Sequence, residues 1–253
     1  MQSSAELSNA WQPCENKTGT IKFIAIICMI IDHAGVVFFP QYTEFRIIGR
    51  IAFPLYAWCL VIGSEHTHSL TRYMIRILLM LLISQPFYML ALQHDLFELN
   101  IFATLFLGLF GIMGIKLKRG LSQIWMPLLA VLAACCIKID YGWKGVAFIL
   151  LLYPARKNRG TLAAIMIAFC LFWGQGTILV KTLFSLSLND LFNLTPYGES
   201  LVNSALKLQT AALLALPVML IRYKREIRLP RYIAYAAYPA HLAIIYIITL
   251  LMK

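Results

Sequence analysis

Long apolar runs separated by short polar breaks limit how this chain can fold more than any other feature. A helix that crosses a bilayer needs about 20 mostly apolar residues. Nine runs of roughly this kind follow one another, at 20–39, 46–64, 70–93, 99–115, 121–137, 142–155, 160–181, 205–222 and 232–252. Charged residues make up only 13% of the chain, against roughly 25% in soluble domains. We therefore predict an all-α, polytopic membrane helix bundle with about nine transmembrane helices.

The basic residues gather in every second loop between these runs. They are Arg72, Arg76, Lys116, Lys118, Arg119, Arg156, Lys157, Arg159, Arg222, Lys224, Arg225, Arg228 and Arg231. Because cytoplasmic loops carry an excess of Lys and Arg, this alternation predicts a cytoplasmic N-terminus and a periplasmic C-terminus. We interpret 1–253 as one transmembrane domain, with a cytoplasmic tail at 1–18 and an external loop at 185–203. The net charge of +11 then reflects topology and contact with membrane lipids, and it gives no indication of nucleic-acid binding.

Five ionisable positions in the predicted spans are candidate functional sites, because such side chains are costly there. One of them, Arg46, is also suited to extending toward the membrane interface. Asp32 and His33 lie roughly 18 Å along the first span, just past the bilayer midplane. Arg50 falls in the outer third of the second span, and His241 falls near the midplane of the last. Their depths predict one polar cavity that opens outward.

Further polar residues extend this predicted site at its outer side. Asn100 begins the fourth span, Asp140 and Tyr141 precede the sixth, and Tyr238 shares a helix face with His241. We assign these four to substrate binding. Two simpler roles remain open, since Asn100 is also suited to joining helices and Asp140 to capping one.

The chemistry of this set favours catalysis by proton transfer. A histidine in a partly dry site can act as a general base, and an arginine can stabilise an oxyanion or bind an anionic group. Asp32 either orients His33 or pairs with Arg50, because neighbouring residues on a helix point about 100° apart. A purely structural Asp32–Arg50 ion pair and a packing role for His241 are the alternatives. The cysteine spacing matches no zinc site, and we expect no metal.

Several segments of the sequence, in order, resemble the TraX family of conjugative inner-membrane proteins. The most specific block runs from Lys22 through Asp32 and His33 to Gly35, and is followed by the segment 48–57 around Arg50 and Pro54. The resemblance continues through 100–105, 140–145 and 238–242. It therefore covers nearly the whole chain.

This resemblance implies a bacterial inner-membrane acyltransferase that moves an acetyl group from cytoplasmic acetyl-CoA to the N-terminal amine of pilin subunits. On this interpretation His33, with Asp32, takes the amine proton, Arg50 stabilises the oxyanion, and His241 is a second acid or base. Arg156, Lys157 and Arg225 on the basic inner face would bind the phosphates of the donor.

Other functions are compatible with the same residues. The acceptor could be a glycan hydroxyl or another peptide. A proton-coupled transporter of a small solute would use Asp32, His33 and His241 as a proton relay. A non-catalytic assembly factor that holds pilin subunits in the membrane would need no polar centre.

Overall fold

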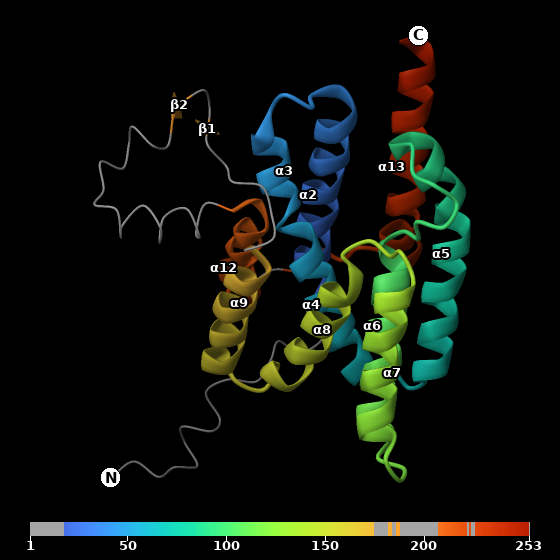
Figure 1. Cartoon of the computed structure of the whole chain (residues 1–253), viewed down its shortest axis with the longest axis vertical. Helices are drawn as coiled ribbons and strands as arrows, with labels where there is room; N and C mark the ends of the chain where they lie inside the picture. The colour runs from blue at the N-terminus through green and yellow to red at the C-terminus, as the bar shows by residue number, and fades with distance from the viewer. Residues whose placement is uncertain are drawn as a thin grey trace.

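The computed structural model describes residues 18–174, 182–183, 186–187, 207–221, 223 and 226–252, and helices occupy each apolar run within them (Figure 1). The elements are α2 (Gly19–Phe38), α3 (Thr43–Gly49), α4 (Ala52–His66), α5 (Leu70–Leu92), α6 (Ile101–Leu117), α7 (Ser122–Cys136), α8 (Gly142–Ala155), α9 (Arg159–Gly174), β1 (Thr182–Leu183), β2 (Leu186–Ser187), the 3₁₀ helix η1 (Leu208–Leu214), α12 (Ala215–Leu220) and α13 (Arg231–Leu251). β1 and β2 form a two-residue antiparallel pair. The predicted helical class is therefore confirmed. Arg225, nearly all of the 1–18 tail and nearly all of the 185–203 loop lie outside the described residues.

Four helical segments of the described chain are long and apolar enough to cross a bilayer. They are Gly19–Phe38, Thr43–His66, Leu70–Leu92 and Tyr232–Leu251. The remaining apolar helices have 10–17 residues, fewer than the roughly 20 that a straight crossing needs. These helices support the prediction of a membrane protein, whereas the count of nine spans and their orientation stay predictions.

The second apolar run, predicted as one helix over 46–64, is divided into α3 and α4 at Arg50 and Ile51. Pro54 has no N–H, so the carbonyl of Arg50 loses its usual helical donor and is crowded by the proline ring. The chain tightens instead, because the N–H of Ile51 donates to the carbonyl of Ile48 at 3.1 Å. This break fixes the position from which the Arg50 side chain extends.

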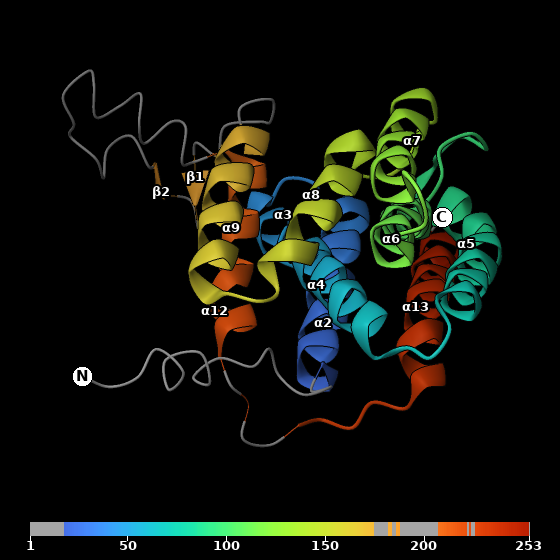
Figure 2. The same ribbon diagram turned by 90° about the horizontal axis from the view of Figure 1, so that it is seen from below.

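α4 lies in the middle of the bundle, in contact with α2, α6, α8 and α12, and α2 in turn contacts α3, α4 and α13 (Figures 1 and 2). On one flank α5 packs against α13, and α6 packs against α5 and α7. On the other flank α8 contacts α9, which in turn packs against η1 and α12. Asp32 and His33 of α2 therefore lie between two groups of helices, and each can contact a different helix.

Loops that the charge pattern assigns to one side of the membrane do share one end of the bundle. Glu65 pairs with Lys116 at 3.2 Å and with Arg156 at 3.1 Å, which connects the ends of α4, α6 and α8. At the opposite end, Leu99 and Ile139 form a parallel bridge between the loops that precede α6 and α8. We call these the inner and outer ends, after the predicted orientation.

Candidate functional site

Two histidines from the first and last described helices meet inside the bundle. His33 Nδ1 of α2 lies 2.6 Å from His241 Nε2 of α13, and the two rings are nearly parallel at 9°. The Nδ1 of His241 also lies 2.8 Å from the carbonyl oxygen of Ala237, one turn earlier on α13. Residues more than 200 positions apart thus form one hydrogen-bonded pair, as their predicted depths led us to expect.

Tyr238 packs on both members of this pair. Its ring meets the rings of His33 and His241 edge-on, with centroids 6.1 Å and 5.4 Å away, and it meets Phe102 of α6 in the same way at 5.2 Å. Tyr238 is 4% exposed, and its hydroxyl oxygen has no hydrogen-bond partner among the described residues. Three aromatic contacts therefore keep the histidine pair largely dry on this side.

Asp32 faces away from the histidines, toward α3. Its Oδ2 accepts a hydrogen bond from Arg50 Nη2 at 3.1 Å, and its Oδ1 lies 3.1 Å from Arg46 Nη1 in an ion pair that lacks hydrogen-bond geometry. The roughly 100° between successive helix positions explains this division, since Asp32 and His33 cannot both face one neighbour. Of the two partners predicted for Asp32, Arg50 is the one in contact, whereas His33 pairs with His241.

The close contact between α2 and α3 depends on a glycine. A Cβ atom on Gly49 would lie 2.2 Å from both Cγ and Oδ1 of Asp32, far inside contact distance. A residue with any side chain would therefore push the carboxylate away. Gly49 allows the backbone of α3 to lie directly against Asp32, which places the next residue, Arg50, beside the carboxylate.

Arg50 continues from Asp32 into a cavity of about 350 Å³ at the outer side. Its Nη1 donates to Gln209 Oε1 at 3.3 Å, and its guanidinium carbon lies 5.8 Å above the ring of Tyr141. Trp173 lines the same cavity and contacts Tyr141 edge-on. This cavity combines a cation with aromatic walls, and neither His33 nor His241 lines it.

Tyr141 adopts a backbone conformation that is rare for a residue with a side chain. Its φ is +66°, and Gly142 follows at +56°. The ring of Tyr141 stacks on Phe53 with centroids 4.1 Å apart, and this contact helps to hold the turn before α8. The carbonyl of the preceding Asp140 accepts a hydrogen bond from Thr104, so the backbone of this loop is fixed to α6.

Asn100 is occupied by structural hydrogen bonds. Its Oδ1 accepts from the N–H of Phe102 and caps α6, while its Nδ2 donates to Gln85 Oε1 at 2.9 Å and to the carbonyl of Leu81 at 3.0 Å. These contacts join α5 to α6 and match the alternative role given above. Substrate binding by Asn100 stays a prediction.

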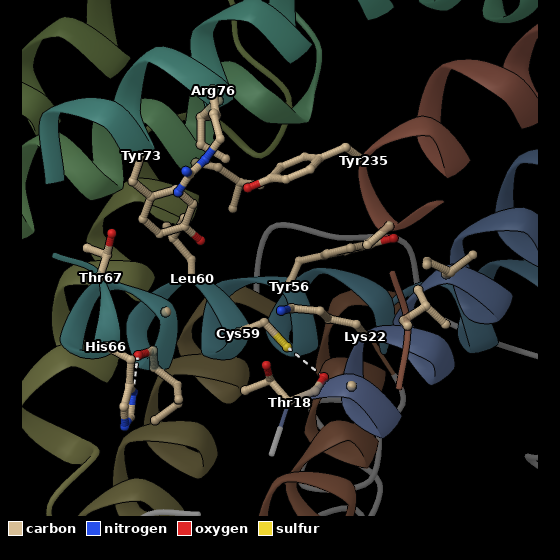
Figure 3. Close-up of a pocket in the computed structure, with 18 of the residues that line it drawn as sticks. Thr18, Lys22, Tyr56, Cys59, Leu60, His66, Thr67, Tyr73, Arg76 and Tyr235 are labelled. Carbon is tan, nitrogen blue, oxygen red and sulfur yellow. Dashed lines mark hydrogen bonds between the residues drawn. The ribbon is translucent and has the colours of Figure 1, made fainter. Parts of the chain in front are cut away.

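A cavity of about 740 Å³ lies among the inner halves of α2, α4, α5 and α13 and the start of α6 (Figure 3). Four cations line it, Lys22, Arg72, Arg76 and Arg228, together with one carboxylate, Glu226. Toward the centre of the bundle the lining becomes apolar and aromatic and ends at Ile26, Phe102 and Tyr238. Tyr238 therefore contacts both this cavity and the histidine pair.

The sequence led us to a different set of cations for donor binding. Arg156 donates to Glu65 and to the carbonyl of Tyr153 and stacks on the Tyr153 ring, so it joins α8 to α4. Lys157 is exposed in the loop after α8. The inner cavity is lined instead by Lys22 and Arg76. Arg76 was assigned only to the charge pattern of the loops, and Lys22 was given no role. No local pattern distinguishes either residue from other cations.

These features define a class of protein, namely a helical membrane protein with a buried polar centre between two cavities. The family comparison agrees, because the model of the family described as "TraX protein" matches residues 17–249. The chain therefore belongs to the TraX family. This confirms the resemblance that the motifs indicated.

Two further proteins are similar to this chain. One is a "Probable fimbrial assembly protein FimC, serogroup H1" of Dichelobacter nodosus, 30% identical over 245 residues that cover 89% of this chain and 92% of that protein. The other is "Uncharacterized protein RP591" of Rickettsia prowazekii (strain Madrid E), 45% identical over 47 residues, or 17% of this chain and 19% of that protein. No solved structure matches this chain.

Proposed function

We propose that this protein is an acyltransferase of the bacterial inner membrane that moves an acetyl group from acetyl-CoA to the N-terminal amine of pilin subunits. The observation that carries the proposal is the hydrogen-bonded pair of His33 and His241 beside a large cationic cavity. A base is needed because the attacking amine must lose a proton as the amide forms. The name of the relative FimC, a fimbrial assembly protein, supports a pilin-type acceptor.

The inner cavity suits the donor by charge and by shape. Coenzyme A carries phosphates at one end and a slender, mostly uncharged arm that ends in the thioester. Lys22, Arg72, Arg76 and Arg228 offer charge-assisted hydrogen bonds to phosphate. Lys22 lies eleven residues before His33 on the same helix, or about 16 Å, a separation that an extended pantetheine arm can span. We therefore propose these residues for donor binding, in place of Arg156 and Lys157.

The reaction uses the residues in the following way. The acceptor nitrogen attacks the thioester carbonyl carbon, the C–S bond breaks, and the sulfur leaves as the coenzyme A thiolate. The histidine pair takes the proton that the nitrogen releases and returns it to this sulfur, so that coenzyme A departs as the free thiol. Arg50 and Tyr141, in the outer cavity, contact the acceptor, and the Asp32 carboxylate holds Arg50 in position. Aromatic residues around the pair exclude water that would hydrolyse the thioester.

The experiment uses the full-length protein in proteoliposomes with radiolabelled acetyl-CoA and a peptide that carries a free pilin-type N-terminus. We expect label in the peptide with wild type, and a loss of roughly 10²-fold or more with His33→Ala. His94→Ala is the matched control, because His94 is a half-exposed histidine that pairs with Glu98 and lines neither cavity. Full activity of His33→Ala would contradict the assigned base.

The same samples distinguish the other functions. Label in a glycan or in a different peptide would change the acceptor but keep the reaction. Uptake of a solute driven by a proton gradient, with no transfer of label, would identify a transporter that uses the histidine pair as a proton path. Absence of both activities would favour a non-catalytic assembly factor.

A further inference from the structure

We propose that His33 takes the acceptor proton through its Nε2 atom and transfers positive charge to His241, so that the charge is held on α13 until the leaving coenzyme A thiolate takes a proton back from His33 Nε2. This inference rests on the proposed acyl transfer and names the reacting atom. It follows from two hydrogen bonds that lie in series, from His33 to His241 and from His241 to the Ala237 carbonyl.

The Ala237 carbonyl fixes where the hydrogens are. A carbonyl oxygen can only accept, so the His241 Nδ1 that lies 2.8 Å away must carry a hydrogen. In neutral His241 the other nitrogen, Nε2, is then an acceptor. The hydrogen bond at 2.6 Å therefore requires a hydrogen on His33 Nδ1. The remaining ring nitrogen of neutral His33, Nε2, carries the free lone pair and makes no hydrogen bond with any described residue.

The direction of charge transfer follows from the same contacts. When His33 Nε2 binds the acceptor proton, His33 becomes an imidazolium whose Nδ1 hydrogen already points at His241 Nε2. Movement of that hydrogen over the short bond leaves neutral His33 and charged His241. Charged His241 has both of its N–H groups bonded, to Ala237 and to His33, whereas charged His33 would have one N–H without a protein partner. The arginines beside Asp32 also make a positive charge less favourable on His33 than on the more distant α13.

His241 thus has two roles that substitutions can separate. It accepts the hydrogen bond that holds His33 in the Nδ1–H tautomer, and it takes up the proton. His241→Gln offers an amide oxygen that preserves the first role but cannot do the second. His241→Leu removes both. His94→Gln is the matched control for an exposed histidine.

We expect kcat to fall roughly tenfold in His241→Gln and by roughly 10²–10³-fold in His241→Leu, with KM for acetyl-CoA little changed. Rates in mixtures of H₂O and D₂O supply a second readout, because two protons moving together give a curved dependence on deuterium content. Wild type is expected to show the curve, and His241→Gln a straight line. Equal losses in both variants, or a curve that persists in His241→Gln, would overturn the assignment.

A measurement without turnover keeps this inference distinguishable from the proposed function. Solid-state ¹⁵N NMR of histidine-labelled protein in bilayers reports which ring nitrogen carries hydrogen, and His33→Ala assigns the signal. We expect His33 with hydrogen on Nδ1 and none on Nε2. Hydrogen on Nε2 of the resting protein would refute the inference even if acyl transfer is observed. If acyl transfer is absent, the proposed function fails, and the tautomer is still decided by this spectrum.

Discussion

Replacing Gly49 by alanine tests whether the contact between α2 and α3 positions Arg50. The new Cβ would lie 2.2 Å from Asp32 Cγ, whereas carbon atoms in contact lie at about 3.5 Å or more, so the helices must separate by about 1.3 Å. Overpacking of this kind costs about 1–3 kcal/mol. The same displacement would stretch the 3.1 Å contact between Arg50 and Asp32 and leave two buried charges poorly paired.

We expect Gly49→Ala to lower the melting temperature in detergent by roughly 2–12 °C, since 1 kcal/mol corresponds to about 2–4 °C for a chain of this size. Gly160→Ala is the matched control, because its Cβ would meet only the Asn158 side chain at 3.2 Å. A double-mutant cycle with Asp32→Gly then isolates the contact. Gly49→Ala should cost less than about 1 kcal/mol in the Asp32→Gly background. An equal cost in both backgrounds would refute the reasoning.

Three further predictions concern residues outside this contact. Lys22→Gln should raise KM for acetyl-CoA roughly tenfold through loss of a phosphate contact. The control Lys118→Gln, at a residue outside the cavity lining, should leave KM unchanged. The same KM in both variants would show that Lys22 does not bind the donor. Asn100→Ala should lower the free energy of unfolding by about 2–3 kcal/mol, because it removes a helix cap and two hydrogen bonds between helices. Asn158→Ala, at an exposed cap, should lower it by about 1 kcal/mol in the same thermal unfolding experiment. Burial raises the pKa of Asp140, in the loop before α8, from 3.8 to about 6. The folded state therefore binds more protons than the unfolded state between these values, and stability falls as pH rises through this window. Asp140→Asn should be more stable than wild type at pH ~7 and equal at pH ~4; the reverse order of melting temperatures would contradict the burial of this carboxyl.

The sequence allowed the helices and the central residues to be predicted, because both depend on local rules. Apolar runs of sufficient length define helices whatever their neighbours. A rise of about 1.5 Å per residue then placed His33 and His241 at similar depths before any contact was known. The angle between neighbouring positions also raised the pairing of Asp32 with Arg50 as one of two choices. Only packing could decide between them.

The features that were not predicted depend on contacts between distant segments. The inner cavity, which we propose for the donor, is lined from α2, α4, α5, α6 and α13, and no local pattern distinguishes Lys22 or Arg76 from other inner-face cations. Arg156 has a side chain suited to binding phosphate, but it pairs with Glu65, which lies 91 positions earlier in the sequence. The role of Asn100 likewise depends on Gln85 of another helix. The sequence of one segment cannot reveal such partners.

The adjacency of Asp32 and His33 has a physical consequence even though the two side chains face different helices. Two arginines, Arg46 and Arg50, lie beside the centre of α2, and both pair with Asp32. Without that carboxylate, two unbalanced positive charges would stand one residue from His33 and oppose its uptake of a proton. With it, the net charge on that face is reduced and Arg50 is held toward the outer cavity. If His33 performs the proposed proton transfer, Asp32 supports it by balancing the charge of these arginines. Asp32→Asn should therefore slow acetyl transfer in the proteoliposome assay, even though Asp32 does not touch His33.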